Sequence, residues 1–204
     1  MHWPDGYSIA GNAISDPGVT RCGIFADAGS TPRSVCSPWH PVFNAGLIAC
    51  GALTALGAIL LHKCWTGAVG RAGTTLIALS GLYVIGAGAA PWDVAPDIHD
   101  TAAFGQALTQ WLAMGILATA AGACRFRTLT VATTLVSISA FVAFLMALEG
   151  TVLPGLSLGI SERLAFDTMT LWTAITGVTS FAALRPCSSA SELPRSAAQG
   201  EIAS

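Results

Sequence analysis

Five stretches of the chain are apolar over about the length that a helix needs to cross a membrane. They lie at about 42–62, 73–91, 99–124, 128–148 and 164–184. A spanning helix has about 20 apolar residues, matching roughly 30 Å of hydrocarbon. Only 10% of the 204 residues are charged, against about 25% in soluble domains. Alanine, glycine and threonine are frequent and the connections are short, so the sequence predicts an all-α, polytopic transmembrane helical bundle of five spans.

The stretches divide the chain into three parts. Residues 1–41 are rich in glycine, proline and serine and predict an external irregular segment. Residues 42–184 predict the helical bundle. Residues 185–204 are polar and predict a disordered cytoplasmic tail.

Charged residues in the connections predict the orientation, because lysine and arginine favour cytoplasmic loops. Alternate connections and the tail carry Lys63, Arg71, Arg125, Arg127, Arg185 and Arg195. The other connections carry Asp93, Asp97, Asp100, Glu149 and Glu162. We therefore expect a multi-pass protein of the cell membrane with an external N-terminus and a cytoplasmic C-terminus. Residues 1–41 contain no apolar run that could carry them across, so we expect a sixth spanning helix upstream of Met1.

Cysteine usage leaves one pairing open. Cys22 and Cys36 both lie in the predicted external segment, where an oxidising compartment allows a disulfide. No Cys-x-x-Cys or Cys/His spacing typical of zinc sites or redox motifs occurs. We expect no metal and no cofactor.

Two helical faces stand out by spacing. His99, Ala103, Gln106 and Gln110 recur four, three and four residues apart, which places them on one stripe that should face protein rather than lipid. Gly46, Cys50, Thr54 and Gly57 form a stripe of small residues in the first apolar stretch. That stripe predicts close packing against another helix.

The segment GISERLAFDTMTLW (159–172) places three charges at the start of the last apolar stretch. Ser161 predicts a helix N-cap, with Glu162 in the first turn. Arg163 and Asp167 are four residues apart and can pair. Such a pair contributes only about 0.2–0.5 kcal/mol in water, while a charge in mid-membrane costs at least ~2.5 kcal/mol. Pairing with Arg163 therefore does not offset the cost of placing the Asp167 charge in a membrane-spanning stretch.

Four short motifs resemble one family of membrane proteins. They are GYSIAGNAISDPG (6–18), SPWHPVFNAGLIACG (37–51), IHDTAA (98–103) and GISERLAFDTMTLW (159–172). The sequence resembles the bacterial and archaeal integral membrane proteins grouped as domain of unknown function 998. The resemblance implies a six-helix bundle whose first helix precedes the first motif, and it supplies no activity. Pro17 replaces a leucine that is usual in that family.

A polar site is predicted where the acidic connections meet the outer ends of the helices. Its candidate catalytic residues are Glu162, Asp167 and His99, which offer acid–base capacity. Its candidate ligand-binding residues are Arg163, Asp16, Asn44, Glu149 and Gln106. Arg163 would hold the carboxylates, including Glu149, or bind an anionic headgroup. A structural network of ion pairs is the alternative.

Three function classes remain open at this level. The first is an enzyme acting on a lipid or isoprenoid at the outer leaflet, the second a small permease, and the third a non-catalytic assembly protein. No known nucleophile, metal-binding or phosphate-binding motif is present to decide whether the chain is an enzyme. We expect membrane lipid as a partner and no nucleic acid, and leave a protein partner or homo-oligomer open.

Overall fold

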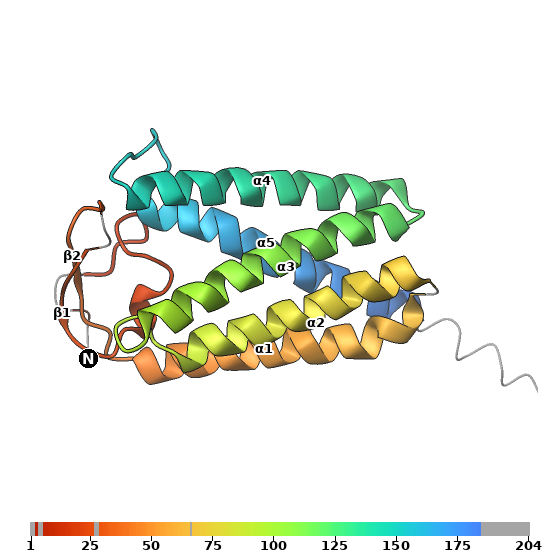
Figure 1. The fold of residues 1–204 in the computed structure, drawn as a ribbon, viewed down its shortest axis with the longest axis horizontal. Helices are drawn as coiled ribbons and strands as arrows, with labels where there is room; N and C mark the ends of the chain where they lie inside the picture. Colours follow the sequence, from red (N-terminus) through yellow and green to blue (C-terminus); the bar gives the residue numbers. More distant parts are fainter. Residues whose placement is uncertain (1–2, 4–5, 27–28, 66, 185–204) are drawn as a thin grey trace, which may run out of the picture.

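Five long helices make up most of the computed structural model, which describes residues 3, 6–26, 29–65 and 67–184. They are α1 (His40–Leu61), α2 (Ala68–Ala89), α3 (Pro96–Ala120), α4 (Cys124–Leu148) and α5 (Leu158–Leu184). Each overlaps one of the five apolar stretches, and this confirms the all-helical class (Figure 1). The predicted tail, 185–204, lies outside the described residues.

Three of these helices have the length and apolar composition that crossing a membrane requires. One is α1 together with the short 3₁₀ helix His62–Cys64 that follows it, and the others are α2 and α4. Helices α3 and α5 carry more polar side chains, including those of the stripe on α3 and of the motif on α5. The chain therefore has the apolar helices of a membrane protein.

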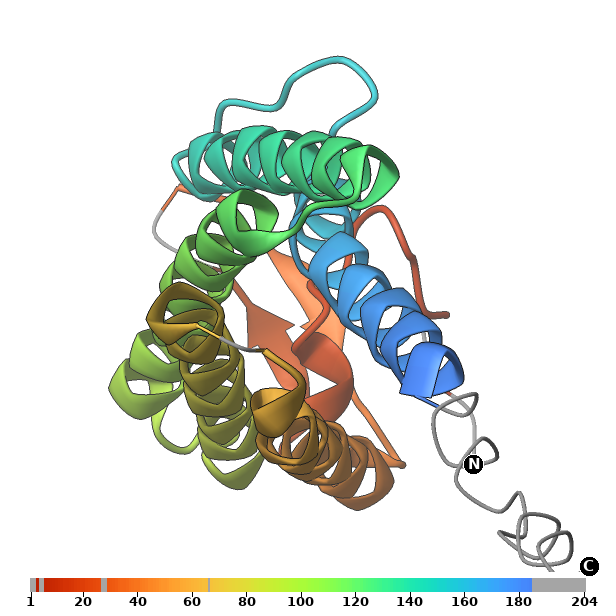
Figure 2. The ribbon, with the colours of Figure 1, turned by 90° about the vertical axis from the view of Figure 1, so that its right-hand side faces the viewer.

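The helices pack in chain order and form an open arc. Figure 2 looks along the bundle and shows α1 and α5 at the two ends of this arc, with α2, α3 and α4 between them. The shared core contains Ile77 of α2, Met114 of α3, Phe141 of α4 and Trp172 of α5. Helices α1 and α5 meet only weakly.

Helices α1 and α2 approach each other closely where each has a glycine. A Cβ atom added to Gly81 would lie 2.6 Å from the carbonyl oxygen of Gly51, so neither position has room for a side chain. Ala55 and Ala58 continue this buried face of α1. The close approach therefore uses a different face of α1 from the small-residue stripe that contains Gly46 and Gly57.

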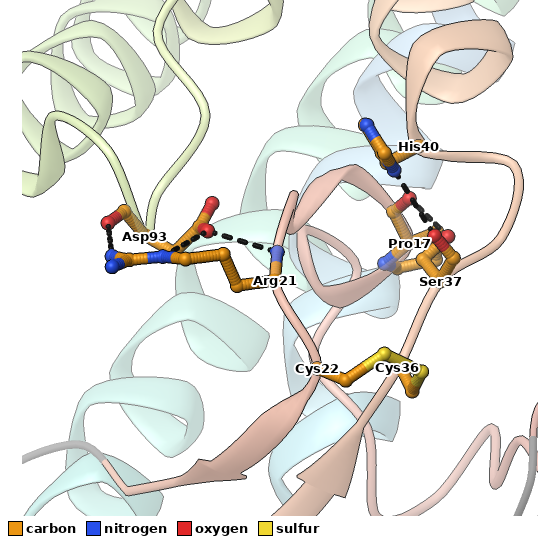
Figure 3. The surroundings of a disulfide bond; sticks show 7 residues. All are labelled: Pro17, Arg21, Cys22, Cys36, Ser37, His40 and Asp93. Carbon is orange, nitrogen blue, oxygen red and sulfur yellow. Dashed lines mark hydrogen bonds and ion pairs between the residues drawn. A yellow bond between two sulfur atoms is a disulfide. The ribbon is translucent and has the colours of Figure 1, made fainter.

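Residues 6–26 and 29–39, here called the N-terminal layer, cover one end of the bundle (Figure 1). The layer contains a 3₁₀ helix (Asp16–Gly18) and two short antiparallel strands, β1 (Gly23–Phe25) and β2 (Arg33–Val35). In the strand register Gly23 lies opposite Val35 and Phe25 opposite Arg33. A Cys22–Cys36 disulfide joins the strands where they leave the bundle (Figure 3). The structure thereby answers the pairing question that the sequence left open.

Candidate functional site

A cavity of about 430 Å³ lies beneath the N-terminal layer, between α1, α2, α3 and α5. We call it the polar cavity. Its polar and charged lining residues are Tyr7, Ser15, Thr54, Ser80, His99, Gln106, Gln110, Glu162, Arg163, Asp167, Thr170 and Thr173. The layer contributes Tyr7, Ile14, Ser15 and Pro17 to the wall.

The predicted stripe on α3 faces this cavity over its whole length. His99, Ala103, Gln106 and Gln110 all line it, so the stripe faces the space between the helices. The side-chain amide of Gln106 makes no hydrogen bond within the described part of the chain. Gln106 is therefore free to bind a ligand.

His99 is held in one orientation by the end of α2. Its Nδ1 lies 3.1 Å from the carbonyl oxygen of Ala87 and 2.9 Å from that of Ala90. Carbonyl oxygens only accept hydrogen bonds, so Nδ1 carries a proton. In the neutral ring Nε2 then bears a lone pair, and His99 becomes an oriented hydrogen-bond acceptor and base at the cavity wall.

A hydrogen-bonded bridge joins three helices across the inner part of the cavity. The Ser80 hydroxyl of α2 donates to Oε1 of Gln110 on α3 at 2.7 Å. Nε2 of Gln110 donates to the Thr173 hydroxyl of α5, also at 2.7 Å. The bridge ties α5 to the α2–α3 pair, so Gln110 holds the wall of the cavity together.

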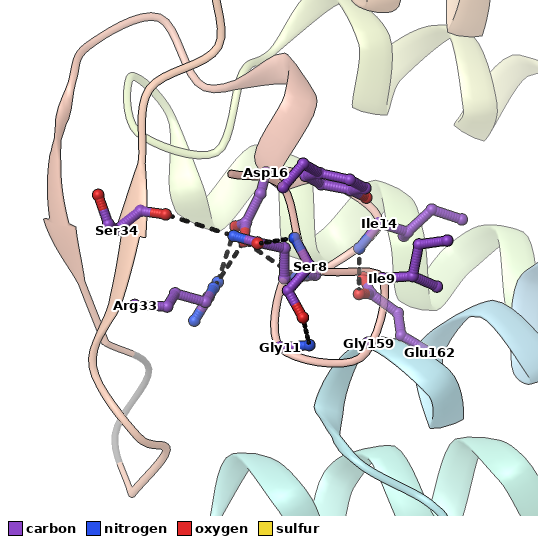
Figure 4. A network of polar contacts seen from close by, with 12 residues as sticks. Ser8, Ile9, Gly11, Ile14, Asp16, Arg33, Ser34, Gly159 and Glu162 are labelled. Carbon is purple, nitrogen blue, oxygen red and sulfur yellow. Dashed lines mark hydrogen bonds and ion pairs between the residues drawn. The ribbon is translucent and has the colours of Figure 1, made fainter. Parts of the chain in front are cut away.

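Glu162 lies under the N-terminal layer, before the apolar stretch 164–184. The side chain points toward Ile14, whose backbone N–H donates to Oε2 at 2.5 Å (Figure 4). Burial raises the pKa of this carboxyl group to about 8; the Ile14 hydrogen bond lowers it, and the nearby Asp16 carboxylate raises it. Glu162 is therefore mainly protonated near neutral pH and can act as a proton donor.

The helix around Glu162 starts earlier than its sequence suggests. The Ser161 N-cap prediction is wrong, because α5 begins at Leu158 and the Ser161 hydroxyl donates to carbonyl oxygens of the preceding turn. The backbone N–H of Gly159 donates to the carbonyl of Ala10 at 3.0 Å. This contact with the N-terminal layer stabilises an additional turn that the local sequence does not reveal.

Arg163 fastens the N-terminal layer to α5. Its Nη1 donates to the carbonyl oxygens of Ile9 and Asn12, both at 2.9 Å, and to that of Gly159 at 2.8 Å. Its Nη2 donates to the Tyr7 hydroxyl, and the guanidinium carbon lies 5.6 Å from the centre of the Tyr7 ring. Burial raises the pKa of Tyr7, while the Arg163 charge opposes that shift.

The pairings expected for Arg163 are not formed. The ion pairs of the described residues include neither Arg163 with Asp167 nor Arg163 with Glu149, because the backbone carbonyls of the layer occupy the guanidinium. The Asp167 side chain lines the polar cavity and makes no hydrogen bond or ion pair in the part of the chain that is described. Asp167 therefore faces the cavity with its carboxylate unpaired.

Three predicted ligand-binding residues lie outside the polar cavity. Asp16 is buried and receives two hydrogen bonds from Arg33. Asn44 donates to the carbonyl of Gly18 at 2.9 Å, and Glu149 is exposed at the end of α4. The structure thus brings together the other five predicted residues: His99, Gln106, Glu162, Arg163 and Asp167.

Asp93 forms a second attachment of the layer to the bundle. Its carboxylate accepts hydrogen bonds from the backbone N–H of Thr20 at 3.0 Å and from the Thr20 hydroxyl at 2.7 Å. Arg21 adds an ion pair at 3.5 Å (Figure 3). Burial raises the pKa of Asp93, but the hydrogen bonds from Thr20 and Arg21 outweigh it, so the net pKa is lowered. Asp93 is therefore a structural residue.

Sequence reasoning missed Tyr7, Ser80 and Thr173, which complete the wall of the polar cavity. Tyr7 is the second residue of the first motif but lies 156 residues from its partner, Arg163. Ser80 and Thr173 are small polar residues within apolar helices, where the sequence alone does not separate ligand contacts from hydrogen bonds between helices. Only the tertiary structure identifies them.

A second cavity, of about 590 Å³, continues from the polar cavity between α1 and α5. We call it the apolar groove. Both cavities are lined by Cys50, Thr54, Thr170 and Thr173. Gly46 and Gly57 line the groove, and a Cβ atom on either would meet nothing within 4 Å. The prediction that their stripe packs against another helix is therefore wrong for the described residues, because the packed face of α1 is the one that contains Gly51.

Comparisons with known proteins place the chain in a family without adding an activity. No curated protein and no solved structure matched it. One family model matches residues 2–179, which is most of the chain. The chain therefore belongs to the family described as "Protein of unknown function (DUF998)", as its four motifs suggest.

Proposed function

We propose that this chain is a five-span protein of the cell membrane, with its N-terminus outside, that binds a lipid or isoprenoid. The polar end of the ligand occupies the polar cavity, and its hydrocarbon chain lies in the apolar groove. The observation that carries this proposal is the continuity of the two cavities, which share four lining residues. A polar compartment joined to an apolar one matches an amphiphile.

The composition of the groove favours a hydrocarbon occupant over an ion. Its described lining contains no Asp, Glu, Lys, Arg or His side chain. A transported ion or proton needs polar or ionisable groups along its path, and of the two cavities only the polar one is lined by carboxyl groups and a histidine. This distribution argues against the permease alternative.

The polar cavity also has the groups for acid–base chemistry on the bound head. His99 offers an oriented lone pair, and Glu162 holds a proton near neutral pH. A base and an acid that line one cavity can remove and donate a proton during a reaction. We propose that any conversion of the ligand uses His99 as the base and Glu162 as the acid.

The binding proposal is tested by filling the groove. Gly57→Trp places an indole ring where the structure leaves open space, and the groove wall includes Gly57. Leu56→Trp is the matched control, since Leu56 is 52% exposed and lies outside both cavities. Lipids that co-purify with each variant are measured by mass spectrometry. Loss of a bound amphiphile in Gly57→Trp alone is expected, and equal lipid content in both variants contradicts the proposal.

A further inference from the structure

The polar cavity presents more free acceptors than free donors. Asp167 offers a carboxylate that makes no hydrogen bond or ion pair within the described part of the chain, and His99 offers the Nε2 lone pair. Gln106 offers an amide that can accept as well as donate. A ligand head that donates hydrogen bonds is therefore better matched than one that only accepts them.

Positive charge in the cavity is already committed. Arg163 is the one lysine or arginine among the described lining residues. Both of its terminal nitrogens donate to the N-terminal layer or to the first turn of α5. A phosphate head would compete with backbone carbonyls and with Tyr7 for Arg163, and its charge would share the cavity with the Asp167 carboxylate. Like charges repel, most strongly away from bulk water.

We infer that the head of the bound amphiphile carries a protonated amine, held by the carboxylate of Asp167. An ammonium group has three N–H donors and no acceptor, which matches a lining whose available groups, Asp167, Nε2 of His99 and the Gln106 carbonyl oxygen, accept hydrogen bonds. An ammonium would also give the Asp167 carboxylate the close ion-pair partner that it lacks among the described residues. This inference rests on the proposed function, because it assigns the head of the same ligand.

The test compares three amphiphiles that have the same hydrocarbon chain length and different polar heads. Full-length protein in detergent is titrated with dodecylammonium, dodecanol and dodecyl phosphate, and binding is measured by calorimetry. Wild-type protein is expected to bind dodecylammonium at least about tenfold more tightly than dodecyl phosphate, a preference typical of complementary charge. Asp167→Asn should remove this preference, and Asp167→Glu, which keeps the charge, should retain it. Glu149→Gln is the control, because Glu149 is exposed and outside the cavity.

The outcomes separate this inference from the proposal on which it rests. Binding of dodecyl phosphate or dodecanol as tight as that of dodecylammonium overturns the amine assignment and leaves amphiphile binding in place. A preference that persists in Asp167→Asn, with its helix content and melting temperature unchanged, also overturns it. If none of the three compounds binds, and Gly57→Trp carries the same lipids as wild type, the proposed function itself fails.

Discussion

Arg33 and Asp16 form a buried bidentate ion pair at the centre of the N-terminal layer. Nε of Arg33 donates to Oδ2 of Asp16 at 2.7 Å, and Nη2 donates to Oδ1 at 2.9 Å. The side chains are only 9% and 1% exposed. Asp16 also accepts hydrogen bonds from the side chain of Asn12 and the backbone of Ala13. This pair therefore holds the layer in shape above the polar cavity.

Replacing Asp16 should unfold the layer. Asp16→Ala removes the buried carboxylate that accepts two hydrogen bonds from Arg33, and removing one partner of a buried pair costs about 3–5 kcal/mol. We expect a clear loss of thermal stability, measured by circular dichroism in detergent. Arg21→Ala is the control, because the Arg21 side chain is 73% exposed in its pair with Asp93 and exposed pairs contribute about 1 kcal/mol or less. Equal losses in the two variants would contradict the structural role of Asp16.

Gly159 should tolerate no side chain. A Cβ atom there would collide with the carbonyl oxygens of Ile9 and Asn12, which both accept from Arg163. Gly159→Ala is therefore expected to loosen the layer and to increase proteolysis within residues 6–26. Gly115→Ala is the matched control in α3, since its Cβ would meet nothing within 4 Å. That change should be neutral, or stabilising by up to about 1 kcal/mol. Equal protease resistance of the two variants would refute the close contact at Gly159.

Glu162 should make stability depend on pH. The pKa of this carboxyl group is raised from 4.5 to about 8 in the folded protein. Between these values the folded state holds a proton that the unfolded state has lost. The contribution of Glu162 to the free energy of unfolding is therefore complete below the pKa of this group in the unfolded chain. It is lost as the pH rises through the pKa of the group in the folded protein.

Melting temperatures across this range test the effect. The wild-type value should fall between about pH 5 and about pH 9, and Glu162→Gln, which stays neutral, should show a smaller fall. The lowered pKa of Asp93 acts in the opposite direction, and only under more acidic conditions. Identical slopes for wild type and Glu162→Gln would show that Glu162 is ionised in the folded state.

Two natural cysteines report the proposed orientation. Cys64 and Cys124 are exposed, and they lie at the end of the bundle opposite the N-terminal layer (Figure 1). With the N-terminus outside, a membrane-impermeant maleimide should label them only after the cells are permeabilised. Asp97→Cys, at the start of α3, should react in intact cells. The reverse pattern would invert the topology.

The sequence predicts the helices well because each is a long apolar run, and it predicts the stripe on α3 because His99 and Gln110 share one helix. It does not predict the partners of Arg163, since Ile9 and Asn12 lie more than 150 positions away and contribute only backbone carbonyls. It also cannot choose between the two small-residue faces of α1, which are alike in composition. Tertiary packing decides that the Gly51 face is buried and that the other face lines the apolar groove.

The position of the apolar groove between α1 and α5 affects how ligand affinity must be described. These helices end an open arc (Figure 2), so in a bilayer the proposed ligand would reach the groove sideways, through lateral diffusion among lipids. Occupancy then depends on the mole fraction of the ligand in the membrane and not on its aqueous concentration. Dilution with inert lipid should empty the site, whereas dilution with buffer should leave it filled.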